Sequence, residues 1–336
     1  NVCIACNQAC LDQIFAHKTA SCLVNPRACH ETKLVYETTS QPKRMAVVGA
    51  GPAGLAFATV AAERGHEVTL FEKSDILGGQ FNFATRIPGK EEYQYTIDYF
   101  AGQLEKYQVK IKRNIEVTPA CLHDFDEVIL ATGVKPRIPH IPGIDHPSVM
   151  TYAAFLQGVH QAGSRVAIIG AGGIGFDVAE ALMHDKDDDA KTGFYREWGI
   201  DVNMSQRGGV VLPEKPRMIR DVYLLQRKKE KMGRRLGKTT GWIHRMSLKH
   251  REVNMISGVS YQRIDDDGLH ILIDHKPEVL KVDSIIVCAG QEEMNALYQP
   301  LKQAGRSVHL IGGAFKALEL DARHAINQAS RLAAVL

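Results

Sequence analysis

The sequence has 336 residues, of which 45% are hydrophobic and 24% charged, and its formal net charge is +3. This length predicts two or three domains, and the composition is typical of a globular protein. The mild charge argues against a nucleic acid or an anionic membrane as a partner, and the longest apolar runs are too short and too rich in glycine to cross a membrane.

Four of the seven cysteines lie within the first 22 residues, with the spacing C-x2-C-x3-C-x11-C. They are Cys3, Cys6, Cys10 and Cys22. Four thiolates can hold a [4Fe–4S] cluster, and three of them within eight residues suit one side of it. Structural zinc is the alternative, although zinc sites usually come as two separated C-x2-C pairs, and plain thiols are a third reading. The odd total of seven cysteines and their uneven distribution favour a reducing cytoplasm over a disulfide framework.

A first glycine turn follows the apolar segment at 45–48 and opens a helix. In this turn Gly49 permits a sharp bend, Gly51 lets the backbone approach a pyrophosphate, and Gly54 allows the helix to pack on the strand. Glu72 follows the next strand, 23 residues after Gly49, where an acid can accept hydrogen bonds from both ribose hydroxyls. The pattern predicts a dinucleotide site, and a purely structural turn is the alternative.

A second turn with the same spacing contains Gly170, Gly172 and Gly175. Around both turns, apolar runs such as LHILID at 269–274 alternate with helical segments. This alternation favours parallel sheets that are covered on both faces.

The strand after the second turn is delayed by an inserted segment, residues 183–221, and then ends in Gln226, Arg227 and Lys228. An acid at this point would favour NAD, whereas basic side chains suit the 2′-phosphate of NADP. We therefore expect Arg227 and Lys228 to bind NADPH. A solvated basic turn is the alternative.

Several short motifs resemble those of flavoproteins with two dinucleotide domains. The residues that carry this resemblance are Pro52, Ala53, Gly79, Gln80, Ala131, Thr132 and Gly133. The resemblance implies FAD on the first turn and a return to the FAD domain through Gly312 and Gly313, where the family has Gly-Asp. Asp321 is then a candidate cap for the last helix. Disulfide reductases of this superfamily have a redox cysteine pair where this chain has Gln80, so we exclude that chemistry.

The whole arrangement resembles the C-terminal portion of the bacterial NADPH-dependent 2,4-dienoyl-CoA reductases. Trimethylamine dehydrogenase, the enoate reductases and other iron–sulfur flavoproteins of the old-yellow-enzyme type share this layout. The resemblance implies that NADPH reduces FAD, that FAD reduces the [4Fe–4S] cluster, and that the cluster reduces FMN. In that family the FMN lies in a TIM barrel that precedes the cysteines.

The resemblance also implies that the barrel is the partner of this chain and binds the acyl-CoA substrate. The catalytic residues are then expected in the barrel, and none is assigned here. Because the sequence lacks an initial Met, we expect it to be a piece of a longer protein that serves β-oxidation of unsaturated fatty acids. Two alternatives remain. One is the same module in an enoate reductase or a trimethylamine dehydrogenase-like enzyme, and the other is a nucleotide-binding scaffold that does not oxidise NADPH.

The expected fold is α/β, with two Rossmann-like dinucleotide-binding domains, for FAD and for NADPH, after a short cysteine-rich [4Fe–4S] segment. The predicted ranges are 1–42 for the cluster segment and linker, 43–162 for the first part of the FAD domain, 163–290 for the NADPH domain and 291–336 for the return to the FAD domain.

Overall fold

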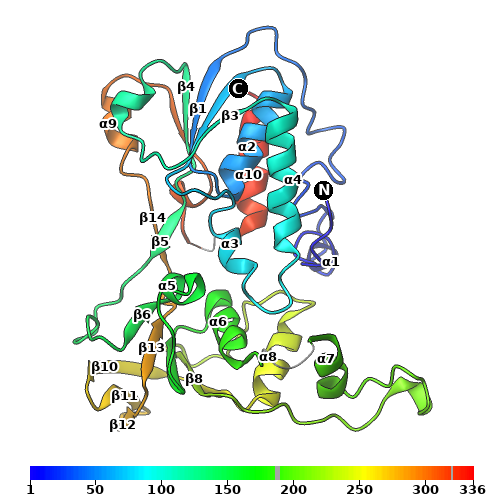
Figure 1. The fold of residues 1–336 in the computed structure, drawn as a ribbon, viewed down its shortest axis with the longest axis vertical. Helices are drawn as coiled ribbons and strands as arrows, with labels where there is room; N and C mark the ends of the chain where they lie inside the picture. Colours follow the sequence, from blue (N-terminus) through cyan, green and yellow to red (C-terminus); the bar gives the residue numbers. More distant parts are fainter. Residues whose placement is uncertain (186–189, 319–320) are drawn as a thin grey trace. The chain divides into compact units, whose positions relative to one another are not determined.

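The computed structural model describes residues 1–185, 190–318 and 321–336 (Figure 1). The chain divides into two compact units, of which unit 1 comprises Asn1–Lys135 and Gln291–Leu336 and unit 2 comprises Pro136–Gly290. Each unit contains a five-stranded sheet whose neighbouring strands are parallel. The expected α/β class with two Rossmann-like sheets is therefore confirmed.

The sheet of unit 1 has the strand order β15-β4-β1-β2-β3. Its strands are β1 (Arg44–Val48), β2 (Glu67–Phe71), β3 (Lys110–Lys112), β4 (Glu127–Leu130) and β15 (Val308–Leu310). Alternate residues of β1 enter different cores: Met45 and Val47 pack with helix α2, whereas Ala46 and Val48 pack with Leu122 on the opposite face. This two-sided burial explains why β1 is a continuous apolar run, as a covered parallel strand requires.

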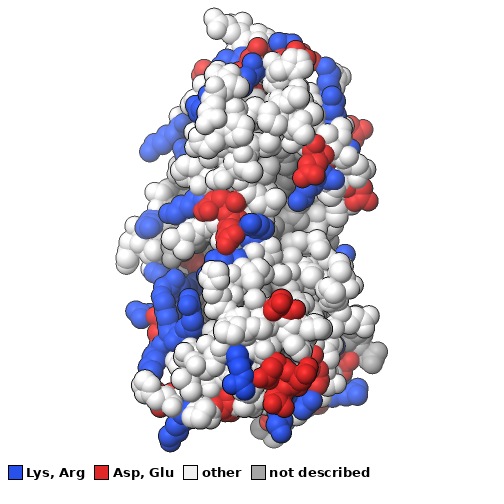
Figure 2. All heavy atoms as spheres, turned by 90° about the vertical axis from the view of Figure 1, so that its left-hand side faces the viewer, with Lys and Arg blue, Asp and Glu red and all other residues white. Residues whose placement is uncertain are grey.

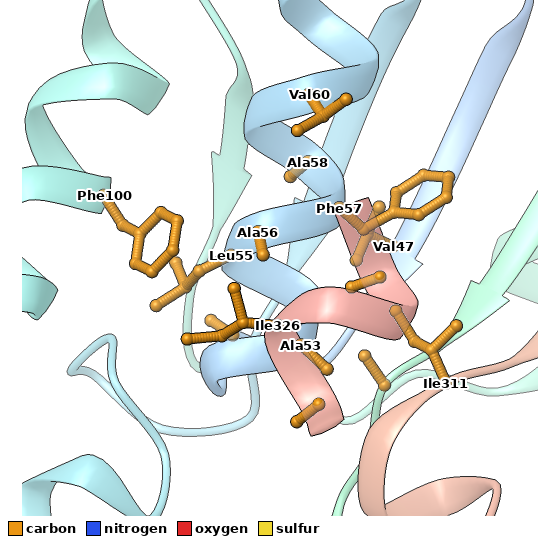
Figure 3. Packing of buried hydrophobic residues seen from close by; sticks show 14 of the residues in the cluster. Val47, Ala53, Leu55, Ala56, Phe57, Ala58, Val60, Phe100, Ile311 and Ile326 are labelled. Carbon is orange, nitrogen blue, oxygen red and sulfur yellow. The ribbon is translucent and has the colours of Figure 1, made fainter. Parts of the chain in front are cut away.

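The helices of unit 1 include two that pack directly on each other, α2 (Pro52–Glu63) and α10 (Ala322–Ala333). Figure 3 shows Ile326 of α10 beside Ala53 and Leu55 of α2, with Phe100 of α4 pointing toward Leu55. Small alanine side chains let the two helices approach closely. The other helical elements of unit 1 are α1 (Leu11–Ile14), α3 (Phe81–Ala84), α4 (Tyr93–Lys106), η1 (Pro119–Leu122), α9 (Tyr298–Gln303) and η3 (Gly312–Ala314).

The sheet of unit 2 has the order β6-β13-β7-β8-β9. Its strands are β6 (Val149–Thr151), β7 (Arg165–Ile169), β8 (Asp221–Gln226), β9 (Asn254–Ser257) and β13 (Ser284–Val287). Its helical elements are α5 (Tyr152–Gln157), α6 (Gly173–Met183), α7 (Ala190–Trp198), η2 (Arg207–Gly209) and α8 (Gly241–His250). Because β6 pairs with β13, residues 136–162 lie in unit 2, whereas the sequence analysis placed them with the FAD domain.

A second sheet in unit 2 is antiparallel and has the order β10-β11-β12. Its strands are β10 (Val259–Asp265), β11 (Gly268–Ile273) and β12 (Lys276–Leu280). The sequence had predicted the 269–274 segment among the parallel strands. The prediction of a strand is correct, but its parallel orientation is wrong, because the two-residue turn between β10 and β11 allows only an antiparallel return.

Two short strands, β5 (Val134–Pro136) and β14 (Gln291–Glu293), pair with each other where the chain leaves and re-enters unit 1. None of the helices in the described ranges is long and apolar enough to span a bilayer. On the face drawn in Figure 2, basic and acidic side chains are interspersed, in keeping with the small net charge.

Candidate functional site: two glycine turns and a cysteine segment

The first glycine turn joins β1 to α2 and tolerates no side chain at two positions. Gly49 has φ +104°, and a Cβ atom there would lie 2.5 Å from the carbonyl oxygen of Ala131. A Cβ atom on Gly54 would lie 1.9 Å from the carbonyl oxygen of Gly49. The two glycines therefore allow the helix to start directly against the strands, as a dinucleotide turn requires.

The second turn joins β7 to α6 and repeats this geometry. Gly170 has φ +114°, and its Cβ atom would lie 2.4 Å from the carbonyl oxygen of Cys288. A Cβ atom on Gly175 would lie 2.0 Å from the carbonyl oxygen of Gly170. Gly172 has no heavy atom within 4 Å of its Cβ position among the described residues, so its space is open to a ligand.

Both helices that follow these turns begin with a backbone suited to bind an anion. Gly51 and Gly172 are the N-cap residues of α2 and α6, both extended, and neither has a side-chain cap hydrogen bond. The first backbone N–H groups of a helix need acceptors, and the helix dipole favours a negative charge there. Each turn thus fits the diphosphate of a dinucleotide.

Glu72 lies just beyond β2 and is almost completely buried. Its Oε2 accepts a hydrogen bond from the backbone N–H of Ala50 (2.8 Å), and its Oε1 accepts from the N–H and the hydroxyl of Ser74 (2.9 Å each). The carboxylate therefore holds the first glycine turn in place. Both lone pairs of Oε1 are used by these bonds, whereas Oε2 has one left, so Oε2 is the oxygen that is compatible with the ribose contact predicted from the sequence.

The predicted flavin-binding motifs come together around the first turn. A Cβ atom on Gly79 (φ +52°) would lie 2.8 Å from Cα of Gly51. A Cβ atom on Gly312 (φ +57°) would lie 2.8 Å from Cβ of Ala53, next to Pro52 at the first position of α2. The neighbouring Gly313 is buried in η3. Three segments distant in sequence, the first glycine turn, Gly79 and η3, thus meet where an FAD would bind.

The polar groups beside these glycines form hydrogen bonds with the segment that re-enters unit 1 and with β5. The amide of Gln80 donates to the carbonyl oxygen of Val134 (3.4 Å) and accepts from the amide of Gln291 (3.1 Å). Thr132 donates to the carbonyl oxygen of Met294, whose N–H donates to the carbonyl oxygen of Gly133 (3.0 Å). These bonds order the backbone on the expected flavin side of unit 1.

The last helix, α10, has the N-cap expected from the sequence. The carboxylate of Asp321 accepts a hydrogen bond from the N–H of His324 (2.7 Å). This bond satisfies one of the free donors in the first turn of the helix. The prediction that Asp321 caps α10 is confirmed.

The basic residues expected to bind a 2′-phosphate follow β8, which pairs with β7 as the sequence analysis assumed. The amide of Gln226 donates to the carbonyl oxygens of Lys228 and Glu230 (2.9 Å each), and this closes a turn. Arg227 and Lys228 are exposed on that turn. The turn offers two cations where an acid would reject a 2′-phosphate.

The cysteine segment folds onto the core of unit 1. Ile4, Ala9, Leu23 and Val24 are buried in the same apolar cluster as α2 and α10. Such burial fixes the backbone between the cysteines. The segment is therefore an integral part of unit 1 and not a loose tail.

The four cysteines of the predicted cluster are free thiols, of which Cys6 and Cys22 are half-buried and Cys3 and Cys10 are exposed. Burial raises the pKa of the Cys6 thiol, a backbone hydrogen bond with Gln8 lowers it, and charge on the other three thiols raises it further. Among the described residues, no three of these sulfur atoms lie within 4.8 Å of one another. A tetrahedral zinc site with Zn–S of about 2.3 Å needs sulfur atoms about 3.8 Å apart.

The comparisons with known proteins identify the family. Residues 43–313 match the family model described as pyridine nucleotide-disulphide oxidoreductase. The chain belongs to this family. As a family member it is an oxidoreductase module that binds FAD and a nicotinamide nucleotide, which agrees with the two glycine turns.

Several relatives of this family member are named as reductases. A metal reductase of Desulforamulus reducens is 32% identical over 97% of this chain and 49% of its own length. A cinnamate reductase of Clostridium sporogenes is 27% identical over 94% of this chain and 43% of its own length. The chain thus spans about half the length of these relatives.

Two solved structures have folds similar to that of this chain. A 2-naphthoyl-CoA reductase, solved with 2-naphthoyl-CoA, is 26% identical, with a TM-score of 0.84 over 99% of this chain and 46% of its own. The histamine dehydrogenase from Rhizobium sp. 4-9 has a TM-score of 0.77 over 99% of this chain and 48% of its own at 19% identity, so it shows the fold alone.

This pyridine nucleotide-disulphide oxidoreductase has no cysteine at the position of the disulfide that gives the family its name. After Gly78 and Gly79 come Gln80, Phe81 and Asn82, and α3 begins at Phe81. Oxidation of a cysteine pair there is therefore excluded, as the sequence predicted.

A groove that the sequence did not predict lies within unit 1, between the cysteine segment and α10. Its volume is about 620 Å³, and Cys22 and Gly312 both line it. Its basic lining residues are Lys18, His30, Lys316, Arg323, His324 and Arg331. These residues come from three separate segments, so no local sequence pattern indicates the groove.

Proposed function

We propose that this chain is the electron-entry module of a 2,4-dienoyl-CoA reductase that acts in β-oxidation of unsaturated fatty acids. In this proposal Cys3, Cys6, Cys10 and Cys22 hold a [4Fe–4S] cluster, and an FMN-binding barrel precedes them in a longer, cytoplasmic protein. When bound, NADPH supplies a hydride, FAD divides the electron pair, and the cluster accepts single electrons.

The observation that carries this proposal is the place of the cysteines. Their segment is packed into the apolar core that also contains α2 and its glycine turn. Cys22 and Gly312 line the same groove, so a cluster ligand and the predicted flavin loop are close in unit 1.

The acyl-CoA substrate is supported by a relative. The 2-naphthoyl-CoA reductase aligns with 99% of this chain, and its name gives a CoA thioester as its substrate. The cinnamate reductase favours the second candidate, an enoate reductase with the same module. The chain covers less than half of either protein, so we place the choice of substrate in the preceding barrel.

In this proposal the chain's own residues bind and orient the carriers. The N-termini of α2 and α6 hold the two diphosphates, and Glu72 holds the first glycine turn while its Oε2 accepts from a ribose hydroxyl. Arg227 and Lys228 neutralise the 2′-phosphate of NADPH. The return segment at Gly312 and Gly313 closes the flavin site against α2.

We expect Cys6→Ser to abolish the broad iron–sulfur absorption of the purified chain while flavin absorption remains. Because FAD is reduced before the cluster in the proposed order, NADPH should still bleach the flavin and reduce an artificial dye at a near-normal rate. The visible spectrum and a dye-reduction assay measure both effects. Cys121→Ser, an exposed cysteine outside the segment, is the matched control and should keep the cluster. Loss of flavin reduction in a Cys6→Ser protein that still binds FAD would contradict the order.

The substrate is tested with the longer protein that contains this chain. We expect NADPH-dependent reduction of a 2,4-dienoyl-CoA, measured by loss of the dienoyl absorbance, and at least ten-fold slower reduction of free enoates. The reverse preference would support the enoate reductase and sink the dienoyl-CoA assignment.

A further inference from the structure

The fold does not explain the hydroxyl group of one partly buried tyrosine. Tyr261 lies on β10 and packs against the apolar cluster that contains Ile169 and Leu225, the residues before Gly170 and Gln226. Its hydroxyl oxygen is buried and has no hydrogen-bond partner in the part of the chain that the structure describes. A buried hydroxyl without a partner costs stability, so a tyrosine in place of phenylalanine here suggests a partner that is bound separately.

The backbone holds Ser257 and Gly258, which precede β10, against the basic turn after β8. Gln226 pairs with Ser257 of β9, and the N–H of Gly258 donates to the carbonyl oxygen of Lys228 (3.3 Å). Gly258 has φ +78°, and its Cβ position lies 3.0 Å from Cγ of Lys229. The turn that leads into β10 is thus fixed against residues 228 and 229, three residues before Tyr261.

An irregularity in β10 occurs at the same place. The pairing of β10 with β11 shifts register between Tyr261 and Arg263. Such bulges change the direction of a side chain and are frequent beside binding sites.

The positive charge of Arg227 influences the pKa of the Tyr261 hydroxyl. Burial raises the pKa of Tyr261 far above its usual value, and Arg227 acts on it in the opposite direction. The raised pKa favours the protonated hydroxyl, which can donate a hydrogen bond. Arg227 and Lys228 are long, exposed side chains, so they can move to admit an anion beside the hydroxyl.

We propose that Tyr261 donates a hydrogen bond to the 2′-phosphate of the nicotinamide nucleotide and determines, together with Arg227, the preference for NADPH over NADH. This inference rests on the proposed use of NADPH. It assigns a specificity role to the antiparallel sheet, because β10 brings the hydroxyl to the ends of parallel strands that carry the glycine turn and the basic turn.

The test compares binding of 2′,5′-ADP and 5′-AMP to the flavin-loaded chain by titration calorimetry. We expect Tyr261→Phe to weaken 2′,5′-ADP about ten-fold or more, because hydrogen bonds to charged groups contribute more than neutral ones. Binding of 5′-AMP should not change. The thermal midpoint without nucleotide should stay equal or rise, since the variant removes only a hydroxyl that has no partner.

Tyr223→Phe is the matched control, because the Tyr223 hydroxyl donates to Asp221 (3.0 Å) at the opposite end of β8. It should leave both affinities unchanged. An equal loss of affinity for both nucleotides in Tyr261→Phe, or no loss of affinity, would overturn the inference.

Arg227→Ala separates this result from the proposed use of NADPH. If Arg227→Ala weakens 2′,5′-ADP and Tyr261→Phe does not, only the role of Tyr261 is wrong. If wild type does not prefer 2′,5′-ADP over 5′-AMP, both proposals fall.

Discussion

At the scale of single residues, Glu127 shows how the fold changes an ionisable group. It is buried at the start of β4, where its carboxylate accepts from Lys43 Nζ (2.8 Å), His309 Nε2 (3.0 Å) and the hydroxyl of Ser307. Burial alone would raise the pKa of Glu127, but these hydrogen bonds outweigh burial and lower the pKa to about 2.

A depressed pKa stabilises the fold above the ordinary pKa of the group. The contribution of Glu127 is therefore complete above about pH 4.5 and is lost as the pH falls toward 2. We expect Glu127→Gln to lower the free energy of unfolding by about 1–3 kcal/mol at pH 7, and the difference from wild type to shrink below pH 4.5. Urea unfolding at several pH values measures it.

Glu67→Gln is the control for this experiment. Glu67 pairs with Lys110 (2.5 Å), but both side chains are more than half exposed, and such surface pairs contribute about 0–1 kcal/mol. A Glu127→Gln difference that stays constant from pH 7 to pH 3 would show that the pKa is not depressed.

Some of these residue roles could be predicted from the sequence and others could not. The spacing of Gly49 and Gly54 predicts a turn, because steric contact within one strand and helix requires it. The bond between Glu72 and Ala50 could not be predicted, since it depends on how β2 sits beside β1. Tyr261 was missed because its local sequence is that of any strand, and the bond of Gly258 to Lys228 that brings the start of β10 to the basic turn forms only in the fold.

At the scale of elements, α10 depends on its N-cap residue, Asp321. Because Asp321 accepts from the N–H of His324, we expect Asp321→Ala to lower the free energy of unfolding by about 0.5–2 kcal/mol. Asp321→Asn is the matched variant and should keep most of the stability, since asparagine also caps helices. Thermal unfolding distinguishes the two, and equal losses would indicate that the charge of Asp321, not its cap, stabilises the helix.

Elements were predicted well where apolar runs are buried on both faces. Strands β1, β4, β7 and β13 are such runs. The strand β12 was not predicted, because four of its five residues are exposed and its sequence, KPEVL, carries no apolar alternation. The orientation of β11 was wrong because apolar content specifies burial and not direction.

At the scale of the molecule, the two units have separate apolar cores. The cluster around α2 lies wholly in unit 1, and the cluster between β7, β8 and the antiparallel sheet lies wholly in unit 2. The sequence predicted two such domains from the repeated glycine turn. It placed the first division later than the structure does, because the pairing of β6 with β13 joins segments over a hundred residues apart.

Separate cores lead to a prediction for thermal unfolding. We expect calorimetry of the FAD-loaded chain to show two transitions, and NADP⁺ at a hundred times its Kd to stabilise only one of them, by about 2.7 kcal/mol. Added FAD should act on the other transition in chain depleted of flavin. A single transition that both ligands move together would show that the units unfold as one.

Unit 1 consists of two stretches of the chain that are separated by unit 2, and this affects how the chain folds during its synthesis. Strand β15 pairs with β4, and α10 packs on α2, yet both are translated after the whole of unit 2. Unit 2 is one continuous stretch of the chain, so it can fold on the ribosome before α10 is made. During that time the face of α2 that α10 later covers stays exposed. The unit translated first is thus the last to be completed, and until then it is the part of the nascent chain that a chaperone would have to shield.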